Sequence, residues 1–270
     1  MCGITGCMEF PDASSNLGRV YAMTATLHHR GPDDDDVWVD ADARLALGHR
    51  RLSIIDLTDA GRQPMVSSCG RFVITYNGEI YNAAELRRDL QAAGRSFTGH
   101  SDTEVIVEGC AIWGIEGMVD RLIGMFALGI WDRRQKQLTL VRDRLGIKPL
   151  YWSFKNGLFL FASELKAFRA APDFEATINR TAVTSFLRYG YVPAPLSIYD
   201  HVQKLEPGTL LSVDADGKVA TKPYWALANA VTAGKVDLFQ GSDDEAVDAL
   251  ESLLTDAIRR RMIADVPLGA

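Results

Sequence analysis

The second residue of the chain, Cys2, could combine a nucleophile with its own base. It follows the initiator Met1 and precedes the small residue Gly3, so removal of Met1 would leave the Cys2 thiol beside a free α-amine. An α-amine titrates at about pH 8 and can accept the thiol proton. Cys2 is therefore the candidate nucleophile. The alternative is an ordinary strand residue behind a retained Met1.

The dipeptide Asn77-Gly78 could stabilise negative charge. It follows an apolar run over 72–76 and precedes a helix start at Asn82. A side-chain amide and a neighbouring backbone N–H form the donor pair of an oxyanion hole. The same dipeptide is also typical of a hairpin turn, so the residues alone leave two interpretations open.

Two charged residues, Arg51 and Asp102, could bind the charged ends of a small substrate. Arg51 lies in an apolar run, where a guanidinium needs a carboxylate partner or a solvent-facing position. A bidentate clamp on a substrate carboxylate would satisfy it. The alternatives are that His49, Arg50 and Arg51 form the polar edge of a half-exposed strand, and that Asp102 only stabilises a helix N-terminus.

The elements that must position these residues alternate between strands and helices. Ser101 with Glu104, and Asn82 with Glu85, have the spacing of a capping box at a helix start. The first ~190 residues therefore predict an α+β fold with helices packed on sheets. Apolar runs bounded by Gly, Asn and Asp predict strands over 3–9, 46–55, 72–76, 125–131, 137–141 and 158–162.

The chain changes character after Tyr191. Pro and Gly residues interrupt it and only short strand-like pieces remain, which predicts a connector over 201–240. A helix then begins at Ser242, where Glu245 completes a capping box. It carries one apolar stripe, and the strand-like residues 265–270 follow it. We expect 241–270 to be the truncated start of a second domain. The stripe consists of Val247, Leu250, Leu254 and Ile258.

The composition excludes several classes of protein. Of the 270 residues, 47% are hydrophobic and 24% are charged, as in globular chains. The net charge is -6 without a basic stripe, so no nucleic-acid partner is expected. No leader peptide or bilayer-length apolar stretch is recognisable. We therefore expect a cytoplasmic protein without a membrane partner.

No metal or disulfide site is expected. The four cysteines lack paired Cys-x-x-Cys spacing, which predicts free thiols. The acidic run 33–36 lacks the ligand spacing of a calcium loop and is interpreted as a solvated loop. The charged segment 142–149 is interpreted as an internally paired structural loop.

Taken together, the motifs of this chain resemble those of glutamine-hydrolysing asparagine synthetases. The likeness spans nearly the whole chain and places an N-terminal class II glutamine amidotransferase domain at 2–200. It implies an N-terminal-nucleophile hydrolase fold, an αββα four-layer sandwich of two antiparallel sheets. The motifs, in order, are Met-Cys-Gly-Ile (1–4), Arg-Gly-Pro-Asp (30–33), Arg-Leu-Ser-Ile-Ile-Asp (51–56), Asn-Gly-Glu-Ile-Tyr-Asn (77–82), Ser-Asp-Thr-Glu (101–104), Gly-Met-Phe-Ala (124–127) and Arg-Asp-Arg-Leu-Gly (142–146).

The resemblance implies a role for each candidate residue. Cys2 would be the nucleophile and its α-amine the base, with the Asn77 side chain and the Gly78 N–H as oxyanion donors. Arg51 would clamp the α-carboxylate of L-glutamine. Two acidic residues would bind its α-ammonium, and four residues after Arg51 would wall the pocket. The two acidic residues are Asp102 and Glu79, and the four residues of the wall are Leu52, Ser53, Ile54 and Ile55.

The resemblance also implies what the parent protein would do. Ammonia would pass to a synthetase domain that makes asparagine from aspartate with ATP and Mg²⁺, and 241–270 would stop just before the ATP-binding loop. No cofactor is expected in this chain, and the oligomeric state, including a homodimer, is left open. Three alternatives stay open: another carboxylate acceptor such as a surface sugar, a phosphoribosyl- or glucosamine-type amidotransferase, and a non-catalytic module. Pro32-Asp33 disfavours the second, and the intact candidate residues disfavour the third.

Overall fold

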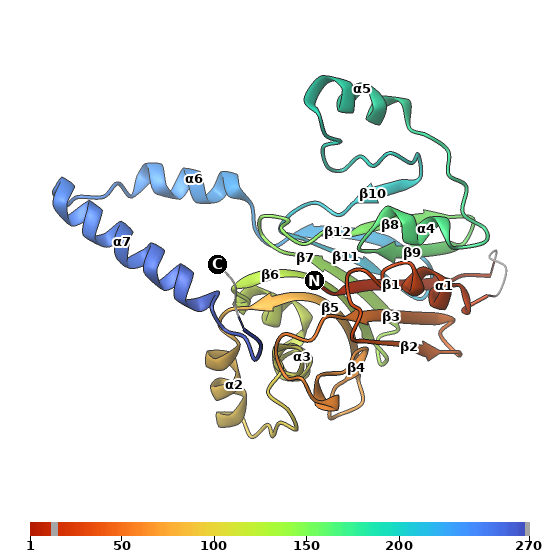
Figure 1. Cartoon of the computed structure of the whole chain (residues 1–270), viewed down its shortest axis with the longest axis horizontal. Coiled ribbons are helices and arrows are strands. Elements are labelled where there is room, and N and C mark those ends of the chain that lie inside the picture. The colour runs from red at the N-terminus through yellow and green to blue at the C-terminus, as the bar shows by residue number, and fades with distance from the viewer. Residues whose placement is uncertain (12–15, 268–270) are drawn as a thin grey trace.

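Two antiparallel sheets of six strands each form the centre of the molecule (Figure 1). The computed structural model describes residues 1–11 and 16–267. The first sheet has the order β10-β8-β9-β1-β3-β2 and the second β12-β11-β7-β6-β5-β4. The first sheet comprises β1 (Gly3–Glu9), β2 (Asp34–Asp40), β3 (Leu45–Arg51), β8 (Tyr151–Lys155), β9 (Leu158–Ala162) and β10 (Val202–Lys204). The second comprises β4 (Met65–Val66), β5 (Phe72–Ile80), β6 (Gly124–Asp132), β7 (Gln137–Arg142), β11 (Thr209–Val213) and β12 (Val219–Pro223).

Helices cover the outer faces of both sheets. On the first sheet, α1 and α4 pack against Cys7, Ala46 and Leu160. On the second, α2 and α3 pack against alternate residues of β5. A third cluster fills the space between the sheets, so the expected α+β four-layer sandwich is confirmed. The helices are α1 (Arg19–Ala25), α2 (Ala83–Ala92), α3 (Asp102–Arg121), α4 (Leu165–Arg169), α5 (Arg180–Tyr189), α6 (Leu227–Val236) and α7 (Asp243–Arg260), with one 3₁₀ turn at Asp59–Gly61.

Strand alternation carries the candidate residues to one end of the sandwich. Successive side chains of a strand point to opposite faces. On β3, Leu45 and Leu47 belong to the cluster between the sheets, so Arg51 shares their inward face. On β5, Val73 belongs to the same cluster, which puts Asn77 on the inward face as well. The hydrophobic core therefore runs directly into the candidate site.

The structure corrects the expected ends of two strands. The strand expected over 46–55 ends at Arg51, and 52–55 is loop. The strand expected to end at Tyr76 continues to Ile80, because β6 supplies partners for Asn77 and Gly78 at Ala127 and Phe126. Asn77-Gly78 is therefore neither a hairpin turn nor a loop after a strand.

Two other local expectations are also wrong. The acidic run 33–36 is no solvated loop, because β2 begins within it and pairs Asp35 with Arg50 of β3. Arg50 binds the Asp35 carboxylate at 2.7 Å, so the charges match across the two strands. Asn82 stands at the N-cap of α2 without a side-chain cap, because its amide bonds the backbone of Arg121 and Ile123 instead.

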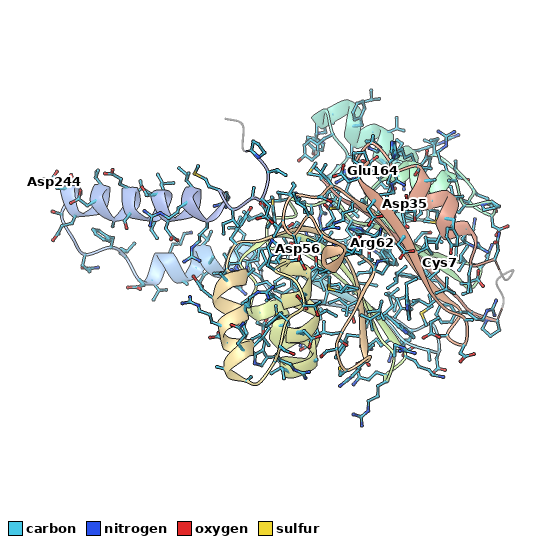
Figure 2. All side chains as sticks on the ribbon, turned by 60° about the horizontal axis from the view of Figure 1, so that its bottom comes forward. Cys7, Asp35, Asp56, Arg62, Glu164 and Asp244 are labelled. Atoms are coloured by element: carbon cyan, nitrogen blue, oxygen red, sulfur yellow. The ribbon has the colours of Figure 1, made fainter. Side chains whose placement is uncertain are left out.

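The segment expected to be a connector, 201–240, contains regular secondary structure. Strands β10 to β12 lie within 201–240 and extend both sheets. Beyond them, α6 and α7 project from the sandwich, with Asp244 of α7 at the far tip (Figures 1 and 2). The capping box of Ser242 and Glu245 is confirmed. Residues 265–267 form no strand, and 268–270 lie outside the described residues.

Candidate active site

A cavity of about 250 Å³ opens at the end of the sandwich where the inward faces of β3 and β5 meet the residues that precede β1. Most of the residues that the sequence singled out line it. They are Cys2, Arg51, Leu52, Ile54, Ile55, Asn77, Gly78, Glu79 and Asp102. Ser53 is the exception, because it does not line the cavity and its N–H donates to the Asp33 carboxylate.

The Cys2 thiol contacts the first residue of the loop that follows β3. Its Sγ lies 3.4 Å from the Leu52 nitrogen and 3.6 Å from the Leu52 carbonyl. The Arg30 Nε donates to the Cys2 carbonyl at 2.8 Å, which fixes the backbone before β1. Burial raises the thiol pKa, so a base must take the proton before the sulfur can attack at neutral pH.

The side-chain nitrogen of Asn77 is a buried donor that no described residue uses. Only 1% of Asn77 is exposed, and its Nδ2 has no hydrogen-bond partner among the described residues. Burying an amide N–H without a partner costs free energy, so such a donor points to a ligand. Beside it, a Cβ on Gly78 would lie 2.2 Å from the Met125 carbonyl oxygen, so only glycine allows β5 to approach β6 here.

Arg51 is buried without a carboxylate partner. It is 6% exposed, and its guanidinium donates to the backbone carbonyls of Thr58 and Asp56. No ion pair to Arg51 occurs within residues 1–11 and 16–267. Gly61 makes room for it, because a Cβ there would meet Arg51 Nη2 at 2.2 Å. The neighbours His49 and Arg50 are buried too, which excludes a half-exposed strand edge.

Asp102 and Glu79 place two carboxyl groups at the cavity. The Asp102 Oδ2 accepts hydrogen bonds from the Tyr76 hydroxyl at 2.7 Å and the Ile80 N–H at 3.0 Å. Burial raises the pKa of both acids, and the negative charge of Asp102 raises that of Glu79 further. No described residue forms an ion pair with either. A ligand cation would stabilise both in the charged form. Ser101, and not Asp102, caps α3 with its side chain.

Other lining residues were not found from the sequence. Lys148 is 4% exposed, and burial lowers the pKa of its ammonium. The loop 142–149 is structural as expected, since the Asp143 carboxylate accepts from the N–H groups of Leu145, Ile147 and Lys148. The interpretation of 142–149 as structural did not predict that Lys148 of this loop lines the cavity. Gly61, Gln63, Thr103, Met125 and Arg261 were also missed.

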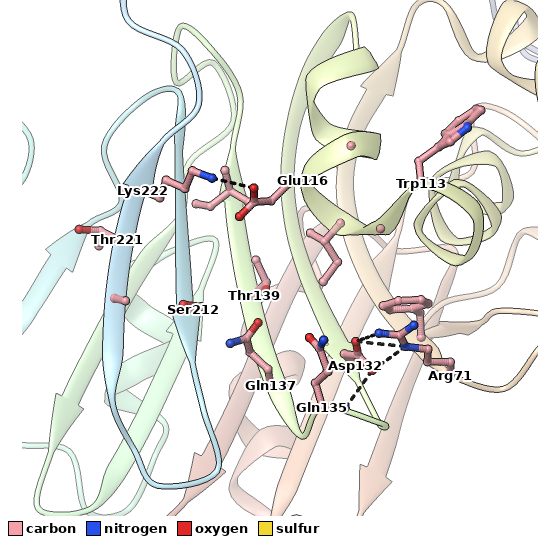
Figure 3. A pocket seen from close by; sticks show the side chains of 16 residues that line it. Arg71, Trp113, Glu116, Asp132, Gln135, Gln137, Thr139, Ser212, Thr221 and Lys222 are labelled. Atoms are coloured by element: carbon pink, nitrogen blue, oxygen red, sulfur yellow. Dashed lines mark hydrogen bonds and ion pairs between the residues drawn. The ribbon is translucent and has the colours of Figure 1, made fainter.

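A second, larger cavity of about 480 Å³ lies on the outer face of the second sheet (Figure 3). Two ion pairs mark it, Lys222 with Glu116 at 2.6 Å and Arg71 with Asp132 at 2.7 Å. Hydroxyl and amide side chains of the strands form its floor, and its lining contains no cysteine or histidine. The cavity at Cys2 is therefore the better candidate for chemistry despite its smaller volume.

Two wider features of the chain bear on its chemistry. Within the residues that the structure describes, no group of three His, Cys, Asp or Glu side chains could hold a metal ion. A helix of the length and apolarity needed to cross a membrane does not occur in the same part of the chain.

Comparison with known proteins agrees with the geometry. A family model for the glutamine amidotransferase domain matches residues 1–225. The chain is 36% identical over 272 residues to glutamine-hydrolysing asparagine synthetase 3 of Bacillus subtilis, which covers 99% of this chain and 42% of that protein. It is 34% identical to asparagine synthetase 1 of the same organism, over 100% of this chain and 41% of that protein. The chain thus spans less than half the length of these relatives.

Among solved structures, the chain resembles glutamine phosphoribosylpyrophosphate amidotransferase from B. subtilis, which was solved with ADP and GMP. The TM-score is 0.63 at 18% identity, over 83% of this chain and 49% of that one. This likeness shows the fold, and it confirms the N-terminal-nucleophile hydrolase architecture.

Proposed function

The chain belongs to the glutamine amidotransferase domain family, and from that premise we propose that its cavity hydrolyses the side-chain amide of L-glutamine. The observation that carries the proposal is the buried Asn77 Nδ2, which has no hydrogen-bond partner among the described residues and lies in the same cavity as the Cys2 thiol. A donor without a partner beside a nucleophile is what an oxyanion intermediate requires.

The proposed reaction begins after removal of Met1. The α-amine of Cys2 takes the thiol proton, and the sulfur forms a bond to the amide carbon of glutamine. Asn77 Nδ2 and the Gly78 N–H stabilise the oxyanion. The C–N bond then breaks, and the protonated α-amine gives its proton to the leaving group. Ammonia departs and leaves a thioester on Cys2. Water hydrolyses the thioester to glutamate and regenerates the thiol.

The two charged groups of glutamine share one Cα atom, and the cavity offers a counter-charge for each of them. Arg51 keeps donor capacity for a carboxylate because only backbone carbonyls bind its guanidinium. The α-ammonium would lie between Asp102 and Glu79, which have no ion-pair partner among the described residues. Leu52, Ile54 and Ile55 would wall the pocket. These substrate contacts favour an amino acid over a simple amide.

We further propose that the parent protein transfers the ammonia to a synthetase domain beyond this chain. There, ATP and Mg²⁺ would activate the aspartate carboxylate. Asparagine as the product is supported by the names of the relatives at 34–36% identity, which are glutamine-hydrolysing asparagine synthetases. Titration calorimetry of this chain with Mg-ATP tests whether the ATP site lies outside residues 1–270. We expect no binding, and binding in the micromolar range would locate an ATP site within residues 1–270.

Glutamine hydrolysis itself is tested by ammonia release from the purified chain, together with its mass. The wild type should lack Met1, release ammonia, and form a stoichiometric adduct at Cys2 with a glutamine-like chloroketone. Cys2→Ala should keep its fold, release no ammonia and form no adduct. Cys2→Ala with the ammonia release of the wild type would contradict the proposal. Asparagine in place of glutamine is the matched substrate control, since it is one methylene shorter.

A further inference from the structure

The segment that follows α7 returns to the candidate active site and binds its rim. Arg260 forms an ion pair with Glu85 of α2 at 2.9 Å. The Arg261 guanidinium lies 4.6 Å from the centre of the Tyr81 ring, and Arg261 lines the cavity. These contacts fix the end of α7 beside the cavity, although no residue of the helix itself is buried.

Asp265 makes the most specific contacts of this segment. One oxygen, Oδ2, accepts from the Asp56 N–H at 2.7 Å and lies 2.7 Å from His100 Nε2. The Asp265 N–H donates to the Ile54 carbonyl at 2.8 Å. Asp265 therefore joins the loop after β3 to the loop before α3, both of which contribute cavity residues.

Asp56, the residue that Asp265 binds, has a backbone that needs external support. Its φ is 57°, in the left-handed region that non-glycine residues rarely adopt. Its buried carboxylate accepts from the N–H and hydroxyl of Thr58 and from the N–H of His100. Asp265 adds the bond to the Asp56 N–H, so it contributes directly to holding this peptide in place.

The Asp56 backbone in turn holds Arg51. Its carbonyl accepts from Arg51 Nη2, and the Thr58 carbonyl accepts from Arg51 Nη1 at 3.0 Å. A continuous chain of hydrogen bonds thus runs from Asp265 through Asp56 to the Arg51 guanidinium at the cavity. Relaxation of the backbone on either side of the Asp56 Cα would move one of the two carbonyls that orient Arg51.

We propose that Asp265 is a positioning residue for Arg51 and thereby sets the affinity of the cavity for glutamine. The inference rests on the proposed function, because Arg51 is there the group that binds the substrate carboxylate. Since Arg51 binds a part of glutamine that does not react, its misplacement affects KM and leaves kcat nearly unchanged. The position of the segment 260–267 at the end of α7 then affects the affinity for glutamine.

The test compares glutamine hydrolysis by Asp265→Ala, Asp265→Asn and Asp248→Ala. In Asp265→Ala we expect KM to rise about tenfold, the scale of one lost charge-assisted hydrogen bond, with kcat within about twofold of wild type. Asp265→Asn should recover most of the affinity, because an amide oxygen still accepts from the Asp56 N–H. Asp248→Ala is the matched control, since it removes an exposed aspartate elsewhere on α7, and it should keep the KM of the wild type.

A second measurement does not depend on turnover. Iodoacetamide should alkylate Cys2 at the same rate in wild type and Asp265→Ala without glutamine, whereas protection by glutamine should need about tenfold more of it in the variant. Unchanged KM and unchanged protection in both Asp265 variants would overturn the inference and leave the proposed function intact. A wild type that neither hydrolyses glutamine nor is protected by it would overturn both. A fall in kcat alone would also contradict a positioning role.

Discussion

The buried Nδ2 of Asn77 leads to a prediction about rate. In Asn77→Ala we expect kcat for glutamine to fall by about 100-fold or more, the usual effect of removing one oxyanion donor, with a small change in KM. Steady-state ammonia release measures both constants. Asn229→Ala, an exposed asparagine on α6, is the control and should match the wild type. A large rise in KM with unchanged kcat would assign Asn77 to substrate binding instead.

The environment of the N-terminus predicts the pH profile. Burial lowers the pKa of the Met1 α-amine below its ordinary value of 8.0, and we expect the same direction for the Cys2 α-amine that removal of Met1 would create nearby. Burial also raises the pKa of the Cys2 thiol. A lowered amine pKa means that the free base exists at neutral pH and is lost only on acidification. We expect kcat/KM to decrease as the pH drops through an apparent pKa below 8.0, and to be constant at higher pH. If the apparent pKa of this decrease is about 8.5 or higher, the pKa of a free thiol, direct ionisation of the thiol is indicated instead.

The sequence predicted the catalytic candidates better than their surroundings. Cys2, Arg51 and Asn77 belong to contiguous motifs in which residue type and spacing already suggest chemistry. Lys148 and Gly61 reach the cavity only through the packing of loops on the sheets, and neither sequence context differs from an ordinary turn. Arg51 is an instructive case, because its burial was suspected from its apolar neighbours, whereas the two carbonyls that hold it depend on tertiary structure.

The close approach of β5 and β6 predicts a stability effect at Gly78. In Gly78→Ala the new Cβ would lie 2.2 Å from a backbone oxygen, so we expect a loss of about 1–3 kcal/mol of unfolding free energy, as for overpacking. Gly234→Ala is the matched control, since nothing lies near that position of α6 and alanine favours a helix. Urea denaturation compares the two. Equal stability of both variants would contradict the tight packing.

Errors at the scale of strands and helices have a common physical cause. Asn77-Gly78 has the local chemistry of a turn, but pairing with β6 overrides this preference and extends β5. The acidic start of β2 has low strand propensity, but it pairs with β3 as an edge strand, where Arg50 of β3 binds the Asp35 carboxylate. Local propensity cannot report such partners, since they lie far away in sequence.

The projecting helix α7 predicts uneven protection across the molecule. Its stripe is solvent-exposed, with Val247 at 63%, Leu250 at 56% and Ile258 at 61%, so little packing stabilises it. We expect hydrogen exchange in 243–260 to be faster than in β3 and β5 by orders of magnitude. Mass-spectrometric exchange of the intact chain measures both regions. Protection equal to that of the two strands would mean that the helix docks on the sandwich in solution.

The shared inward faces of β1, β3 and β5 also bear on which genetic changes this chain can tolerate. Its candidate catalytic residues continue the same alternating rows that build the core. A substitution in such a row alters one side chain, but loss of one codon within β3 or β5 would turn Arg51 or Asn77 towards the opposite face. In a library of variants, inactivating single-residue deletions should therefore cluster in these strands, whereas deletions in the exposed α6 remain active.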